Sequence, residues 1–123
     1  MVNINLKSTA LICIDMQKGV FAEGGTLPHV GTDEVLPKAK KVLAVARQAK
    51  IPIIHVKEVH RKEMVDFGRE LDGTEPVHCL ETWSSTEFYW ELAPIDGEER
   101  DRQATLQLLF RYRLINSITR AWG

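Results

Sequence analysis

A short apolar run that ends in a carboxylate constrains the fold of this chain more than any other feature. Residues Ala10–Ile14 are all apolar, and Asp15 follows them directly. Strands with apolar residues on both faces are typical of parallel sheets that are covered by helices. In such sheets ligands bind beyond the carboxyl ends of the strands, so Asp15 is a candidate catalytic residue. The same carboxylate could instead only cap the first amides of the loop.

The residues that follow predict a strand–helix–strand unit. Apolar residues recur at helical spacing over Val35–Ala49, and Thr32 or Asp33 can cap the start of this helix. Ile51–Val56 is a second apolar run, and its proline falls near the start, where a strand tolerates it. Strand, helix and strand between residues 10 and 56 predict a right-handed βαβ crossover. The chain is therefore expected to be an α/β protein.

Local signals predict where the remaining elements lie. Pro37 is expected in the first turn of the helix, where its missing N–H costs nothing. Residues 57–83 show neither a helical nor a strand period, which predicts a long loop. Ser84 and Glu87 fit a capping box at the start of a short helix that ends by Pro94.

Composition limits the classes of partner. The chain has 123 residues, of which 44% are hydrophobic and 27% charged, as expected for one globular domain. Its net charge of -1 gives no electrostatic reason to expect binding to nucleic acid or to an anionic membrane. The sequence shows neither a signal peptide pattern nor an apolar run long enough to span a bilayer. We expect a cytoplasmic protein whose partner is a small molecule, with no nucleic acid and no membrane.

The two cysteines are expected to be free thiols. Cys13 lies in the first strand and Cys79 in the long loop, a placement that fits neither a disulfide framework nor a metal cluster. Cys13 shares a strand face with Asp15 but lies deeper in the sheet, where a buried thiol is inert. Cys79 could approach the site, but only His78 adjoins it in sequence to lower its pKa.

The longer phrase around Asp15 resembles a known family. Asp15-Met16-Gln17, followed by Phe21 and the Gly24-Gly25 turn, is similar to the opening motif of the isochorismatase-like cysteine hydrolases, which include nicotinamidases and N-carbamoylsarcosine amidohydrolases. Residues 65–81 resemble the insert that some members carry after their second strand. The resemblance covers about residues 8–98. It implies the N-terminal part of a doubly wound, Rossmann-type three-layer domain, and a hydrolase of a small amide, carbamoyl or vinyl-ether substrate.

The resemblance also implies a set of site residues. Members of the family use an aspartate as base, a lysine that stabilises charge and a cysteine that attacks the substrate carbon. The resemblance assigns the aspartate to Asp15. Phe21 and His60 are candidate substrate-binding residues, although His60 could instead be a surface histidine.

A metal site is not expected from the sequence. Nicotinamidases in the family bind a divalent metal through an Asp-x-His pair and another histidine soon after. The corresponding residues here are Glu58 and His60, and the next histidine is His78. Because two ligands do not make a transition-metal site, we predict no metal and no cofactor. His55, inside the second apolar run, is expected to be a hydrogen-bonded structural residue.

The resemblance stops after Glu98. The family continues with a strand that holds the catalytic lysine and later with the nucleophilic cysteine, and residues 99–123 contain neither a lysine nor a cysteine. If residues 99–123 are back-translated and read one nucleotide later, the genetic code permits the family phrase, with its lysine beginning in the codon of Gln103. Our hypothesis is that residues 1–98 are a truncated hydrolase domain, inactive as written, and that 99–123 are a frameshifted tail without a domain of its own. Coding DNA whose codons 97–104 cannot spell the shifted phrase would discard the frameshift.

A second hypothesis is a non-catalytic protein that binds a small ligand or a protein partner. Apolar residues of 102–122 fall near one helical stripe with arginines elsewhere, so a tail helix is predicted. This protein would use the Asp15 pocket and the tail helix. An exposed sheet edge beside an apolar tail also favours self-association, so a homo-oligomer is expected, although the tail could instead pack on that edge.

Overall fold

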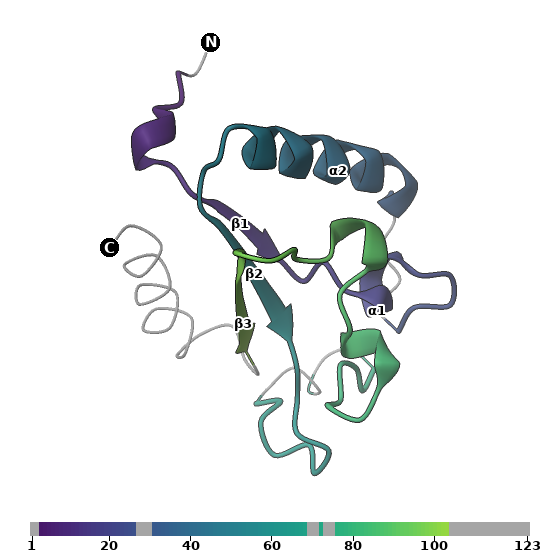
Figure 1. The fold of residues 1–123 in the computed structure, drawn as a ribbon. Coiled ribbons are helices and arrows are strands. Elements are labelled where there is room, and N and C mark those ends of the chain that lie inside the picture. The colour runs from purple at the N-terminus through teal and green to yellow at the C-terminus, as the bar shows by residue number, and fades with distance from the viewer. Residues whose placement is uncertain (1–2, 27–30, 69–71, 73–75, 104–123) are drawn as a thin grey trace.

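Three parallel strands form the sheet of the molecule. The computed structural model describes residues 3–26, 31–68, 72 and 76–103. β1 (Leu11–Ile14), β2 (Ile53–Glu58) and β3 (Glu99–Gln103) pair in the order β1-β2-β3, so β2 is central (Figure 1). Both pairs are parallel, which confirms the predicted α/β fold. The order is that of the first three strands of a doubly wound sheet, 3-2-1-4-5-6.

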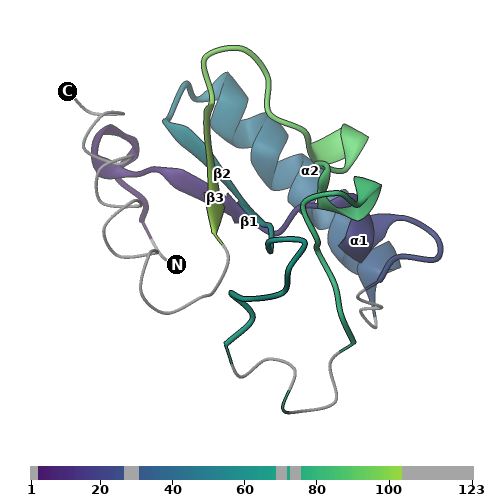
Figure 2. The same cartoon turned by 90° about the horizontal axis from the view of Figure 1, so that it is seen from below.

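A long helix covers one side of this sheet and confirms the predicted βαβ unit. α2 spans Thr32–Gln48 and lies on one side of the three strands (Figures 1 and 2). Its buried Leu43 and Ala46 belong to the same hydrophobic cluster as Cys13 of β1 and Ile53 of β2. Full burial of a leucine or isoleucine side chain contributes about 1.5–3 kcal/mol, so the packing of Leu43 and Ile53 in this cluster helps to hold the helix on the sheet.

The start of α2 differs from the prediction in two respects. Gly31 is the N-cap residue, with a φ of 89°, and within the described residues no side chain caps the helix there. Pro37 lies in the second turn of the helix and not in the first. Its missing N–H therefore removes one bond to the carbonyl of Asp33. Asp33 and Glu34 in the first turn offset part of this loss, because acidic side chains interact favourably with a helix N-terminus.

The C-terminus of α2 ends in a Schellman motif. The Ile51 N–H donates to the Ala46 carbonyl at 3.3 Å, and the Lys50 N–H donates to the Arg47 carbonyl at 3.1 Å. This pairing requires a left-handed residue after the helix, and Lys50 supplies it with a φ of 55°. Glycine usually occupies this position because a Cβ in the left-handed region costs about 1–2 kcal/mol.

Lys50→Gly is therefore expected to stabilise the protein. The change removes the steric cost of the left-handed conformation, and it gives back part of the gain through the larger entropy of glycine in the unfolded chain. We expect a net increase of about 0.5–1 kcal/mol in the free energy of unfolding, measured by urea denaturation. Lys50→Ala keeps the Cβ and should show no such increase. Equal effects of the two variants would contradict this explanation.

β2 begins and ends two residues later than predicted. Its last residues, Lys57 and Glu58, pair with Arg102 and Gln103 of β3. The extra strand partner extends β2 beyond its apolar run, which sequence periodicity alone does not indicate. The tail helix predicted over 102–122 is therefore wrong for Arg102 and Gln103, which are strand residues, and its remainder, 104–122, lies outside the described residues.

The short helix predicted from Ser84 is absent from this part of the structure. Two 3-10 turns, η3 (Ser84–Thr86) and η4 (Trp90–Leu92), are separated by extended backbone at Glu87. The Lys18 N–H donates to the Glu87 carbonyl at 2.9 Å, and the Tyr89 N–H donates to the Met16 carbonyl at 2.9 Å. These bonds hold residues 87–89 against the chain after β1, so tertiary pairing replaces the predicted capping box.

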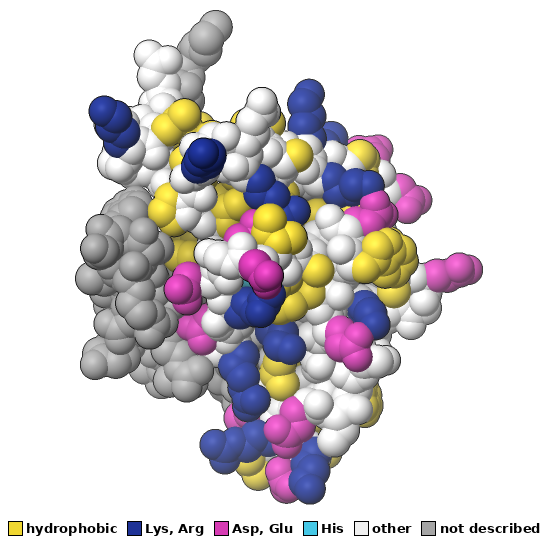
Figure 3. Space-filling view, viewed as in Figure 1, with side chains coloured by type: hydrophobic (Ala, Val, Ile, Leu, Met, Phe, Trp, Pro, Cys, Tyr) yellow, Lys and Arg dark blue, Asp and Glu magenta, His cyan; other side chains and the backbone are white. Residues whose placement is uncertain are grey.

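Two short elements complete the described structure. η1 spans Leu6–Ser8, and α1 spans Lys18–Phe21 just beyond the carboxyl end of β1 (Figure 1). None of the helices in the described segments is long and apolar enough to cross a membrane. On the face shown in Figure 3, acidic and basic side chains of the described residues are interspersed.

A buried ionic network joins α2, β2 and the turn before β3. The Arg47 Nε and Nη2 donate to the Glu98 carboxylate at 2.7 and 3.0 Å. The His55 Nε2 lies 2.8 Å from the same carboxylate, which confirms that His55 is a hydrogen-bonded structural residue. Burial alone would raise the pKa of Glu98, but hydrogen bonds from Arg47, the Ile95 amide and His55 outweigh burial and lower it to about 2.

Candidate metal centre and active-site aspartate

Asp15 lies at the carboxyl end of β1, where the sequence predicts it. Its N–H donates to the Val56 carbonyl of β2 at 2.9 Å, and its carbonyl accepts the Gln17 N–H at 2.8 Å. Its φ of 56° is in the left-handed region, which aspartate tolerates better than most residues. The chain therefore turns sharply away from β2 at this residue. The catalytic role of Asp15 stays a prediction.

Three potential metal ligands meet at the carboxyl end of β2. One ligand atom each from Glu58, His60 and His78 lies within 4.8 Å of the other two. The Nε2 atoms of both histidines face the carboxylate, at 3.4 Å for His60 and 3.5 Å for His78. The two imidazoles are fully buried or nearly so, and the Glu58 side chain is 13% exposed.

Backbone pairing within the long loop brings His78 to this place. The His60 N–H donates to the Cys79 carbonyl at 2.8 Å, and the Glu81 N–H donates to the His60 carbonyl at 2.8 Å. His60 and Leu80 form a parallel bridge. The loop thus returns beside the extension of β2 and carries His78 into contact with Glu58.

Outer partners fix the orientation of both imidazole rings. The Nδ1 of His78 lies 2.7 Å from the Pro76 carbonyl, and the Nδ1 of His60 lies 3.5 Å from the Asp66 carboxylate. Phe67 stacks on His60 at a centroid distance of 3.8 Å and meets His78 edge-on at 5.3 Å. Metal-binding histidines usually place their second ring nitrogen on such a carbonyl or carboxylate, which leaves the Nε2 lone pair for the metal.

The three side chains fit a divalent transition metal. Two imidazoles and one carboxylate form the ligand set of several catalytic zinc sites, in which a fourth position stays open. Burial lowers the pKa of His60, so this ring is neutral at neutral pH, as metal binding requires. The sequence argument counted only two ligands and missed His78. The signal was present in the long loop, which leaves the sheet at the same edge as Asp15.

The two predicted substrate-pocket residues, His60 and Phe21, lie in different surroundings. His60 is fully buried within the ligand cluster. Phe21 is half-buried, packs on the hydrophobic core and has its ring 5.7 Å from that of Tyr89. Contact of either residue with a substrate stays a prediction.

Both cysteines are free and buried, as expected for unpaired thiols. Burial raises the pKa of Cys13 to about 11, with a smaller contribution from Glu98. Burial, together with the nearby charges of Glu58 and Asp15, raises the pKa of Cys79 to about 12. The two thiols are thus protonated at neutral pH, and neither has the reactivity of a nucleophilic thiolate.

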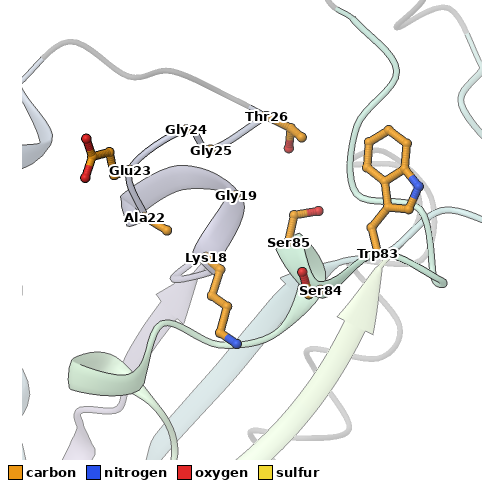
Figure 4. A pocket seen from close by; sticks show the side chains of 10 residues that line it. All are labelled: Lys18, Gly19, Ala22, Glu23, Gly24, Gly25, Thr26, Trp83, Ser84 and Ser85. Carbon is orange, nitrogen blue, oxygen red and sulfur yellow. The ribbon is translucent and has the colours of Figure 1, made fainter.

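A cavity of about 450 Å³ lies between η3 and the loop that follows α1. Thr26 lies on one side of it and Trp83, Ser84 and Ser85 on the other (Figure 4). The hydroxyls of Thr26 and Ser85 are buried without a hydrogen-bond partner in the described structure. Asp15 does not line this cavity.

The fold agrees with a comparison to known families. The family model of the isochorismatase domain matches residues 9–105, which is most of the chain. The chain belongs to the isochorismatase family. The match to this family includes all of β3 and ends at residue 105, past the point at which the sequence resemblance was expected to stop.

Solved structures of isochorismatase-like proteins share this fold. A cysteine hydrolase from Pseudomonas syringae pv. phaseolicola has a TM-score of 0.81 at 24% identity, over 97% of this chain and 57% of its own. A pyrazinamidase from Pyrococcus horikoshii, in complex with zinc, has a TM-score of 0.62 at 27% identity, over 79% of this chain and 52% of its own. A nicotinamidase/pyrazinamidase from Bacillus subtilis has a TM-score of 0.65 at 18% identity, over 85% of this chain and 64% of its own. This isochorismatase-family chain thus spans between half and two thirds of the length of these structures.

Proposed function

We propose that this chain binds a divalent transition metal through Glu58, His60 and His78, beside Asp15, and that these 123 residues alone do not hydrolyse substrate. The observation that carries the proposal is the meeting of the three ligand atoms within 4.8 Å of one another. The similar pyrazinamidase from Pyrococcus horikoshii was solved with zinc, which supports a metal of this class. The natural ligand is expected to be a small amide, carbamoyl or vinyl-ether compound, as the family implies.

Each residue of the proposed site has a distinct part. The imidazoles of His60 and His78 and the Glu58 carboxylate would hold the ion, and the carboxylate offsets one of its two charges. A bound ion of this kind polarises a carbonyl or a similar group of a ligand. Asp15 supplies a carboxylate near the same strand ends, which accepts a hydrogen bond or a proton from an N–H or O–H group of a ligand.

We expect no turnover because neither thiol of the chain can act as the nucleophile. The family reaction needs a thiolate that attacks the substrate carbon. Both cysteines of the chain are buried, with pKa values raised to about 11 for Cys13 and about 12 for Cys79. Residues that act as one catalytic unit lose nearly all their effect when one member is missing, so Asp15 cannot supply the reaction alone.

Hydrolysis assays on the purified 123-residue chain test this proposal. With added zinc or manganese, we expect release of ammonia from nicotinamide and pyrazinamide, and turnover of an N-carbamoyl amino acid, to equal a blank that contains only metal. Iodoacetamide at pH 8 should label neither cysteine in the native protein and both in urea. Hydrolysis that Asp15→Ala abolishes would contradict the absence of turnover. The metal proposal is tested separately by calorimetry, and a chain that binds no zinc would contradict it.

A further inference from the structure

The side chain of Gln17 holds the backbone of the ligand residue Glu58. Gln17 is 1% exposed. Its amide oxygen accepts the Glu58 backbone N–H at 2.7 Å, and its Nε2 donates to the Glu58 carbonyl at 2.9 Å. The two bonds satisfy both backbone groups of the last residue of β2, as a neighbouring strand would.

These bonds replace a strand partner that β1 does not provide. The register of β1 with β2 ends at Ile14 and Val56, because the chain turns away at Asp15. Glu58 therefore lies beyond the end of this ladder on the side that faces β1. Buried backbone groups need hydrogen-bond partners, and the Gln17 amide supplies both of them here.

Gln17 also reaches the loop segments that surround the cluster. Its Nε2 lies 3.4 Å from the Thr86 carbonyl and 3.9 Å from the Sγ of Cys79, which directly follows the ligand His78. Its own N–H donates to the Asp15 carbonyl at 2.8 Å. Gln17 thus contacts Glu58 and Cys79 through its side chain and Asp15 through its backbone.

We propose that Gln17 is a positioning residue of the metal centre, which fixes the end of β2 so that the Glu58 carboxylate faces His60 and His78. This inference rests on the metal binding proposed above. A ligand held in place before the ion arrives loses less conformational freedom on binding. Outer partners of metal ligands typically change metal affinity by about 10–100-fold, and an effect in this range is expected for Gln17.

Zinc titration of the full apoprotein, by calorimetry with a competing chelator, tests the inference. Gln17→Met keeps the length of the side chain and removes both hydrogen bonds to Glu58. We expect its Kd for zinc to rise at least about tenfold. Leu43→Ala is the control, because it weakens the core on α2 without touching the cluster. We expect the Kd of Leu43→Ala to change by less than about threefold. If loss of stability alone weakened zinc binding, Leu43→Ala would raise the Kd as much as Gln17→Met does.

Hydrogen exchange on the wild-type apoprotein gives a second measurement that needs no variant. The Glu58 amide should be protected before zinc is added, because Gln17 already holds it. An unprotected amide in the apoprotein would overturn the inference. A Gln17→Met variant that binds zinc as tightly as the wild type would also overturn it and leave the metal proposal standing. A wild-type chain that binds no zinc would overturn both.

Discussion

Replacing His78 with alanine is expected to weaken zinc binding by about two orders of magnitude. His78 supplies one of the three ligand atoms in the cluster, and its loss leaves the Glu58–His60 pair. Structural sites with four ligands bind zinc with an apparent free energy of about 10–16 kcal/mol, so one ligand is worth about 3 kcal/mol. This energy corresponds to a roughly hundredfold rise in Kd, which calorimetry with a competing chelator can measure.

Glu81→Gln is the matched control for this variant. Glu81 is an exposed carboxylate in the same loop, where it accepts the Lys62 N–H at 3.2 Å, and it is not one of the three ligands. Its replacement should leave the Kd for zinc unchanged. Affinity in the wild type should also fall as the pH drops below neutral, because protons compete for the imidazoles. A His78→Ala variant with wild-type affinity would place the ion elsewhere on the chain.

The contrast between His78 and the other two ligands shows what the sequence could predict of the site. Glu58 is the last residue of β2 and His60 comes two residues later, so both continue the strand that the apolar run predicts. His78 reaches them only because the loop pairs back along the chain, through the bridge between His60 and Leu80. The sequence indicates only that a long loop leaves the sheet at the edge of Asp15. No periodicity indicates how that loop pairs, so His78 could not be assigned as the third ligand before the backbone was known.

The fold shows the same division between local and tertiary signals. The apolar runs and the helical period predicted β1, α2 and β2, because each depends on residues that are close in sequence. The ends of these elements depend on distant partners. β2 reaches Glu58 because Gln103 of β3 pairs with it, and the capping box at Ser84 gives way to pairing with residues 16–18.

Replacing Glu98 with glutamine is expected to lower the free energy of unfolding by about 3–5 kcal/mol at neutral pH. Glutamine keeps the shape of the side chain but leaves the guanidinium of Arg47 without its counter-charge. The Glu98 side chain is 8% exposed and that of Arg47 is 27% exposed, so water replaces the lost interaction poorly. Urea denaturation measures this change. Lys38→Ala is the control, because Lys38 pairs with Glu34 at 3.9 Å on the exposed face of α2, and its loss should cost less than about 0.5 kcal/mol.

The difference between wild type and Glu98→Gln should narrow in acid. The pKa of Glu98 is lowered to about 2 in the folded protein, whereas a glutamate in the unfolded chain titrates near 4.3. The contribution of the charged carboxylate is thus complete above about pH 4.3, and it is lost as the pH falls toward 2. The shift corresponds to about 3 kcal/mol, of which about half should be lost by pH 3 and nearly all by pH 2. A gap of constant size from pH 7 to pH 3 would show that the lost shape, and not the lost charge, destabilises the variant.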